Sequence, residues 1–327
     1  MVLTSPSMLT IPTTDPLLQE FLRQAETAAT FHRGDRLLLA VSGGLTSTAL
    51  AVLCASIREA WELTLHLGHI EETPDAERAA RALGARLRLP LHTAPRRGDH
   101  GEKDTQGVDL SALRTIREMT ESRVIATGET RDSQEETLLA SFLRGASLDD
   151  LGGLAPIAGE IIRPLLPISR KECRLFLERH QIPYSQCPDR LSLAGAEQRV
   201  RLLLLPIIRH HIQPALSSAL DVSTQLLRDD AAFLRALSDA ARSEVSWNAR
   251  PHEVTVNAPR LRVLPPSLRR RLLADAFRLL APEQRVPPED LLRLDREIHG
   301  GNTGTARGTL APLSIERSGD TLLIRRA

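Results

Sequence analysis

The chain has 327 residues and is poor in aromatic residues and in lysine. Tryptophan, tyrosine and phenylalanine together make up 3% of it, so its cores must consist mainly of leucine, alanine, isoleucine and valine. The same scarcity argues against recognition of RNA bases by stacking on an aromatic sheet. Lys103 and Lys171 are the only lysines, so arginine carries nearly all the positive charge. Its guanidinium group suits phosphate and carboxylate.

Cysteine is also scarce, and Cys54, Cys173 and Cys187 stand apart from one another. The absence of paired cysteines argues against a disulfide framework or a zinc ribbon, and a reduced cytosolic environment fits. No run approaches the roughly 20 apolar residues of a membrane span, and the start lacks the charged and apolar regions of a secretory signal. We therefore expect a cytoplasmic protein that does not contact membranes.

The chain is long enough for about two domains. Its formal net charge of +1 hides an uneven distribution, because residues 195–327 contain 20 arginines and 15 acidic residues. A basic second half is compatible with RNA binding and equally with a solvated charged surface. We expect a nucleotide-binding domain over 16–210, a helical linker over 211–250 and a small α+β domain over 251–327.

Apolar residues in the first half predict helices and strands in alternation. Strands are expected at 36–41, 63–69, 86–92 and 123–127, and helices at 16–30, 46–59, 75–83, 110–121 and 134–143; residues 93–107 are expected to form a flexible loop. This order predicts an α/β fold, a parallel sheet with helices on both faces. Farther along we expect a short strand near 161, helices over 171–180, 199–245, 266–280 and 288–298, and strands near 303–325.

The segment after the first strand has the composition of a phosphate-binding turn. It reads Ser42, Gly43, Gly44, Leu45, Thr46, Ser47 and leads into a helix. Glycines let backbone N–H groups approach an anion, and the helix N-terminus adds a favourable dipole. It is neither a Walker A loop nor a dinucleotide fingerprint, because the lysine of the first and the third glycine of the second are missing. A tight turn without a ligand is the alternative.

Two further segments are expected beside this turn. Ligands of parallel α/β sheets bind beyond the carboxyl ends of the strands. His69 ends the second strand, and residues 127–137 follow the fourth. We therefore expect these segments and the turn to converge on one site.

The turn resembles the Ser-Gly-Gly-x-Asp-Ser PP-loop of the ATP pyrophosphatases, with Thr46 at the aspartate position. Residues 127–137 resemble the Thr-Gly-His-His-x-Asp-Asp-Gln-x-Glu-Thr segment of tRNA(Ile)-lysidine synthetases. Glu129 and Thr130 stand at the two histidine positions, and Ser133 stands at the second aspartate. The matching residues are Thr127, Gly128, Asp132, Gln134, Glu136 and Thr137.

The resemblance to this family continues in order along the chain. His69 matches a motif histidine, and residues 264–271 resemble the start of the family's small C-terminal domain. The matching arginines are Arg114, Arg117, Arg144, Arg163, Arg199 and Arg201. Near residue 187 the family's Asp-Pro-Ser-Asn is replaced by Cys-Pro-Asp-Arg.

The resemblance implies a ligase that uses ATP and Mg²⁺ to adenylate the wobble cytidine of tRNA(Ile) with a CAU anticodon. L-lysine then displaces AMP, and pyrophosphate is the other product. ATP would be bound by Ser42, Gly43, Gly44, Thr46, Ser47, Thr127 and Gly128. Asp132, Glu136 and His69 would be catalytic, Asp132 would also bind Mg²⁺, and the six arginines would contact tRNA.

Other interpretations remain open at the level of sequence. The replacements at Thr46 and Ser133 fit a degenerate homologue that binds nucleotide or tRNA without adenylation. A PP-loop enzyme with another substrate is a third interpretation, although the missing paired cysteines weigh against a metal-cluster tRNA thiolase. Asp132 has a structural alternative as a helix cap, and the arginines have one as ion-pair partners. The oligomeric state stays open, a homodimer included.

Overall fold

The structure of the protein is a computed structural model that describes residues 11–71, 73–95, 110–185, 195–281, 286–300, 307–310 and 313–326. Most of the loop expected at 93–107, and Cys187, lie outside the described residues. The chain divides into two compact units. The first comprises Met1–Ala140 and Gly153–Leu220, and the second comprises Ser141–Gly152 and Asp221–Ala327.

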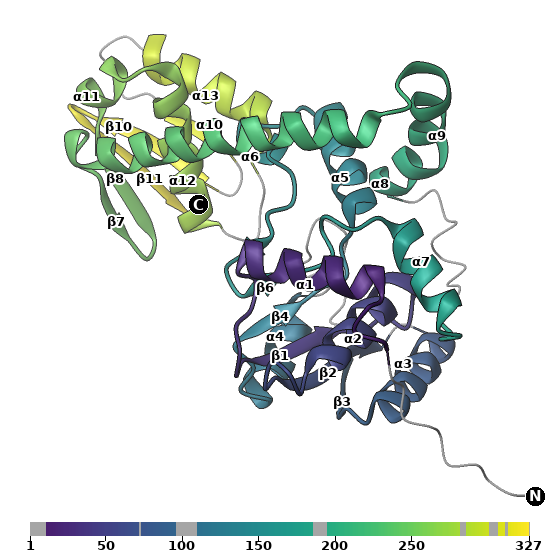
Figure 1. Ribbon diagram of the computed structural model, residues 1–327. Helices are drawn as coiled ribbons and strands as arrows, with labels where there is room; N and C mark the ends of the chain where they lie inside the picture. Colours follow the sequence, from purple (N-terminus) through teal and green to yellow (C-terminus); the bar gives the residue numbers. More distant parts are fainter. Residues whose placement is uncertain are drawn as a thin grey trace, which may run out of the picture. The chain divides into compact units, whose positions relative to one another are not determined.

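The first unit is a mostly parallel sheet with helices (Figure 1). Its strands are β1 (Arg36–Ala40), β2 (Thr64–Glu71), β3 (Leu91–Pro95), β4 (Val124–Ala126), β5 (Ile157–Ala158) and β6 (Ile161–Ile162). Its helices are α1 (Pro16–Ala28), α2 (Leu45–Ile57), α3 (Pro74–Leu87), α4 (Leu110–Met119), the first part of α5 (Arg131–Leu143), α7 (Arg170–Arg179), α8 (Ala196–Arg199) and α9 (Leu205–Ile207), with π-helical turns at Val200–Leu204 and Ile208–Ile212. The strand order is β3-β2-β1-β4-β6-β5, and only β5 and β6 pair antiparallel.

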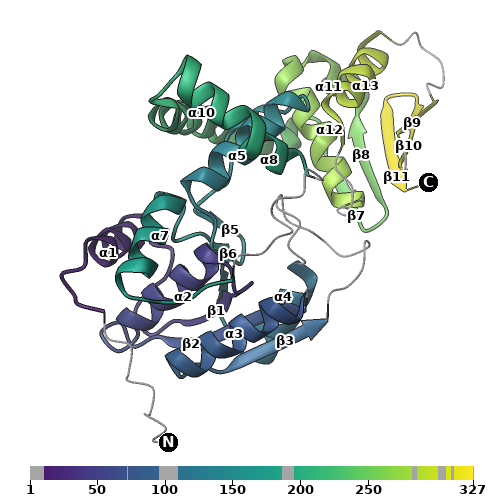
Figure 2. The same cartoon turned by 90° about the vertical axis from the view of Figure 1, so that its right-hand side faces the viewer.

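Helices flank the sheet (Figure 2), and alternate side chains of β1 pack against helices on its two faces. Leu37 and Leu39 are fully buried in the core formed with α1, α2, α3 and α7. Leu38, between them, belongs instead to a cluster with Leu113 and Ile116 of α4. Successive residues of a strand point to opposite faces, so this central strand is apolar on both faces from Leu37 to Ala40. The predicted α/β fold class is confirmed.

The third strand differs from its predicted position, because residues 86 and 87 belong to α3. Arg88 ends that helix in a left-handed conformation with φ of 54°, and the N–H of Leu89 bonds to the carbonyl of Gly84. Pro90 then prevents continuation of the helix, and β3 begins only at Leu91. The apolar run was therefore partly the end of a helix.

The second unit is small and contains an antiparallel sheet of order β7-β8-β11-β10-β9. Its elements are the last part of α5, α6 (Leu148–Leu151), most of α10 (Leu216–Glu244), β7 (Asn248–Arg250), β8 (Glu253–Asn257), α11 (Ala258–Val263), α12 (Pro266–Leu280), α13 (Pro288–Gly300), β9 (Arg307–Leu310), β10 (Leu313–Ser318) and β11 (Thr321–Arg326). The small α+β fold expected here is confirmed, although β7 and β8 were not predicted. Over the described part of the chain, no helix is both long and apolar enough to cross a bilayer.

Candidate functional site

The glycine turn between β1 and α2 is packed tightly against its neighbours. Gly43 has φ of +74°, and a Cβ atom built there would lie 2.9 Å from the carbonyl oxygen of Ala76 in α3. On its other side, the N–H of Ser185 donates to the carbonyl of Gly43 at 2.8 Å. Both the backbone conformation and the close approach require glycine at this position.

The hydroxyl groups of Ser42 and Ser47 form hydrogen bonds within the turn. Ser47 Oγ accepts a hydrogen bond from the N–H of Ser42 at 3.2 Å and lies 3.1 Å from the Ser42 hydroxyl. Gly44 precedes the first residue of α2 and offers no side-chain cap, and the first turn of the helix contains no acidic residue. Neither the N-cap residue nor the first turn thus supplies a side chain to the N-terminal N–H groups of α2, and no cap from another described residue is seen, an arrangement suited to an anion.

The three predicted segments meet at this turn. A Cβ atom on Gly128 would lie 3.0 Å from the backbone nitrogen of Ser47, so the segment after β4 packs directly on the start of α2. The Nδ1–H of His69 donates to the carbonyl of Val41 at 2.7 Å, which ties the end of β2 to the beginning of the turn. His69 is 1% exposed, and its Nε2 has no hydrogen-bond partner.

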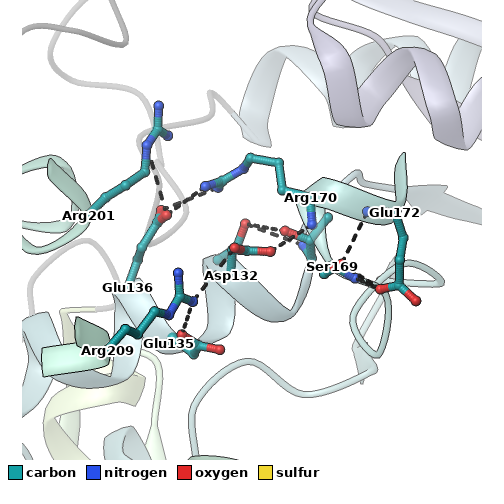
Figure 3. Close-up of polar contacts among 10 residues, drawn as sticks. Asp132, Glu135, Glu136, Ser169, Arg170, Glu172, Arg201 and Arg209 are labelled. Carbon is teal, nitrogen blue, oxygen red and sulfur yellow. Dashed lines mark hydrogen bonds and ion pairs between the residues drawn. The ribbon is translucent and has the colours of Figure 1, made fainter. Parts of the chain in front are cut away.

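The two carboxylates predicted from the motif both bind one arginine (Figure 3). Asp132, in the first turn of α5, accepts the backbone N–H of Arg170 through Oδ2 at 2.7 Å. Glu136, one turn later, receives the guanidinium of the same residue, with distances of 2.7 Å from Nη1 to Oε1 and 3.4 Å from Nη2 to Oε2. Asp132 therefore fixes the backbone of Arg170, and Glu136 fixes its side chain.

Two more arginines neutralise the same face of α5 (Figure 3). Nε of Arg201 lies 4.0 Å from Glu136 Oε1. Arg209 forms an ion pair with Glu135 and lies 3.7 Å from Asp132 Oδ1. Three carboxylates thus face three guanidinium groups, and their charges balance.

The guanidinium of Arg170 stays charged in this setting. Burial alone would lower its pKa, but the hydrogen bond and the charge of Glu136, with the charge of Asp132, raise that pKa above its ordinary value. Arg170 is therefore a permanent cation beside α5.

A second buried ion pair occupies one of the histidine positions of the motif. Glu129 Oε2 lies 3.8 Å from Nε of Arg163 and accepts a hydrogen bond from the Thr127 hydroxyl. Both charged side chains are at most 7% exposed, and Arg163 also donates to the carbonyl of Ala155 at 2.9 Å. The buried negative charge of Glu129 is therefore compensated by the buried positive charge of Arg163.

A carboxylate site for Mg²⁺ does not fit these residues. Mg²⁺ needs oxygen ligands in octahedral geometry, but the oxygens of Asp132 and Glu136 face N–H groups of arginine. Thr46 and Ser133 add no carboxylate, and across the described ranges no three or more His, Cys, Asp or Glu side chains form a metal-binding group. Nε of Arg170 is a buried donor without a hydrogen-bond partner among the described residues, and it suits an acceptor, not a cation.

The six arginines that the resemblance assigned to tRNA contact lie at different places in the structure. Arg114 and Arg117 of α4 both pair with Glu160, the second at 3.1 Å. Arg163 and Arg201 pair with carboxylates of the candidate site. Arg144 belongs to the second unit, and Arg199 is exposed at the end of α8.

Sequence reasoning missed Arg170, Arg209 and Glu135. One signal for Arg170 was present, because Ser169 and Glu172 form a capping box that begins α7 and places the arginine at the first helical position. A cation is unfavourable there unless an acidic group faces it. Arg209 lies 74 residues from Glu135, and no local pattern relates the two.

The chain is similar to known proteins of one family. The family model for the PP-loop domain matches residues 17–214. A tRNA(Ile)-lysidine synthase from Symbiobacterium thermophilum is 31% identical over 249 residues, which cover 71% of this chain and 52% of that protein. The chain thus spans about half the length of this relative. One from Gloeobacter violaceus is 29% identical over 252 residues, which cover 73% of this chain and 75% of that protein.

Among solved structures, a U34-tRNA thiolase from Methanococcus maripaludis has the same fold. Its TM-score is 0.51 at 15% identity, and the match covers 64% of this chain and 78% of that one. At this identity the likeness concerns the fold alone. The chain belongs to the PP-loop domain family, among relatives that are named tRNA(Ile)-lysidine synthases.

Proposed function

We propose that the first unit binds ATP at residues 42–47 and adenylates the wobble cytidine of tRNA(Ile) with a CAU anticodon. The neutral ε-amine of L-lysine then attacks the adenylated carbon, AMP leaves, and the pyrophosphate formed in the first step is released. The observation that supports this most strongly is the uncapped start of α2, on which Gly128 packs. N–H groups there would bind the departing pyrophosphate.

In this proposal His69 acts through the turn, since its Nδ1–H positions the carbonyl of Val41. Asp132 and Glu136 act at the edge of the site through Arg170. The basic part at 251–327 and the arginines predicted from the motifs would bind the tRNA backbone, whose phosphates attract guanidinium groups. Cytoplasmic tRNA is the substrate that fits this assignment.

A direct test is ATP-dependent incorporation of labelled lysine into a tRNA(Ile) transcript with a CAU anticodon. We expect incorporation with this transcript and none with the same tRNA carrying a UAU anticodon. A relative with intact motifs, assayed in parallel, establishes that the conditions support the reaction. Failure of the folded protein under those conditions would refute the ligase assignment.

A second candidate is a homologue that binds nucleotide or tRNA without adenylation. It is favoured by Thr46 and Ser133, which replace motif aspartates, and by the arginines that occupy the remaining carboxylates. Under this alternative the native chain binds ATP without pyrophosphate release, and the double variant Thr46→Asp with Ser133→Asp gains release. No gain in that variant counts against the aspartate losses as the cause of inactivity.

A further inference from the structure

Arg170 is held at both ends by one helix. Its backbone N–H is bound by Asp132, and its guanidinium is bound by Glu136 through two nitrogen–oxygen contacts. The side chain is 19% exposed, so it remains partly accessible while its position is fixed. A guanidinium has five N–H groups in a fixed plane, so the contact to Glu136 orients the remaining ones for an acceptor such as a phosphate oxygen.

The position of Arg170 in its own helix also requires an anion. It is the first residue of α7, where the helix dipole disfavours positive charge, and Lys171 follows it. Ser169 and Glu172 satisfy each other's backbone N–H groups, so they cap the helix without binding the guanidinium. The acidic face of α5 therefore stabilises a cation at a helix start that would otherwise favour an anionic ligand.

Among the described residues, the polar atoms without a hydrogen-bond partner include Nε2 of His69, which is an acceptor while Nδ1 donates, and one nitrogen of Arg170 that can only donate. Nε of Arg170 is buried without a hydrogen-bond partner, whereas Nε of Arg163, also without one, faces the carboxylate of Glu129 at 3.8 Å. The start of α2 has no side-chain cap. Nε of Arg170 and the N–H groups at the start of α2 are donors, so they pair with an acceptor such as a phosphate oxygen and not with a cation.

We propose that Arg170 binds the phosphates of the nucleotide and that arginines held by the carboxylates of α5, in place of a carboxylate-bound divalent cation, neutralise their charge. This inference rests on the proposed ATP site. Glu136 is then a positioning residue that holds the guanidinium until phosphate takes over part of its contacts. Asp132 keeps the backbone of Arg170 in place throughout.

The proposal predicts how the affinity for nucleotide responds to metal and to Glu136. ATP and inorganic pyrophosphate are titrated calorimetrically into the full chain, once with Mg²⁺ and once with EDTA. We expect affinity in EDTA that equals or exceeds the affinity with Mg²⁺. Glu136→Gln keeps one acceptor for Arg170 but removes a negative charge near the phosphates, so ATP should bind about threefold more tightly in EDTA.

Variants of Arg170 give the opposite response. Arg170→Ala removes a bidentate charged contact and should weaken both ligands about tenfold or more. Arg170→Lys keeps the charge without the planar fork and should recover part of this loss, which separates the contribution of the charge from that of the bidentate geometry. Asp35→Asn is the matched control, because Asp35 binds Arg123 at 2.6 Å at the amino end of β1, on the opposite edge of the sheet. It should leave both affinities unchanged.

The outcomes separate this inference from the proposed function. The inference would be overturned if EDTA weakened ATP binding tenfold or more and Glu136→Gln weakened it by a similar factor. That result would show that Glu136 binds a metal ion, and it would leave the proposed ATP site intact. Binding that is insensitive to Arg170→Ala would overturn the inference as well. Absence of any binding of ATP by the native chain would refute the proposed function itself.

Discussion

At Gly43 the backbone conformation and the surroundings both exclude a side chain. Gly34 has a similar φ of +81°, but a Cβ atom there would meet nothing within 4 Å. Gly34→Ala should therefore cost only the left-handed strain, roughly 1 kcal/mol, whereas Gly43→Ala adds a clash with α3 and should cost roughly 2–3 kcal/mol. Urea unfolding measures both free energies.

The same pair of variants tests the turn as a binding site. Gly43→Ala must shift the turn and should abolish ATP binding, whereas Gly34→Ala should bind ATP as the native protein does. Equal affinities in the two variants would contradict a role for the turn.

The buried thiols of Cys54 and Cys173 should be inert. Burial raises the pKa of Cys54 to about 12, and burial with the nearby charge of Glu172 raises the pKa of Cys173 to about 12. At pH 8 about one thiol in ten thousand is then ionised, and the thiolate is the reactive form. In a Cys187→Ser background, a disulfide reagent should label no thiol of the native protein and two after urea unfolding. Rapid labelling of the native variant would contradict this burial.

At the scale of elements, Asp15 links α1 to α7. Its carboxylate caps α1 by accepting from the N–H of Leu17 and also binds Arg179 at 2.7 Å and His180 at 2.9 Å. Burial acts to raise its pKa, but the hydrogen bonds from His180, Arg179 and the backbone outweigh it, so the pKa falls below the ordinary 3.8. Asn is also a good cap, so Asp15→Asn removes the charge and keeps the cap.

We expect Asp15→Asn to lower the free energy of unfolding by roughly 1–3 kcal/mol at pH 7. Because the folded pKa is depressed, this stabilisation is complete above about pH 4 and is lost as the pH falls through the folded value. The difference between variant and native protein, from urea titrations at pH 7 and pH 2.5, should therefore shrink at the lower pH. A difference that is constant or grows on acidification would contradict the assignment.

Local patterns predicted most elements, and tertiary contacts decided the rest. The helix at 266–280 agrees to the residue, because a proline starts it and its apolar spacing is regular. β7 and β8 were missed since they are short and exist through pairing with each other and with β11, more than 60 residues later. The same holds for the candidate site. The order of strands and helices predicted where Asp132 and Glu136 lie. Their common partner Arg170 could not be predicted, because it contacts them across 38 and 34 residues of sequence.

On the scale of the whole molecule, each unit has its own main hydrophobic core. Phe176 is buried in the core of the first unit and Phe277 in that of the second. The chain passes between the units at residues 140, 152 and 220, so neither unit is one continuous stretch of sequence. Stability should therefore be distributed between two cooperative regions, of which only the first contains the proposed nucleotide site.

Calorimetric unfolding of the full chain should show two transitions that respond separately. Phe277→Ala creates a cavity worth about 3–5 kcal/mol and should lower the transition of the second unit, while Phe176→Ala should lower that of the first by a similar amount. ATP at about 100 times its Kd adds about 2.7 kcal/mol to the unit that binds it, so it should raise only the transition that Phe176→Ala lowers. If a single transition moves in all three experiments, the two cores unfold together, and nucleotide binding stabilises the molecule as one cooperative unit.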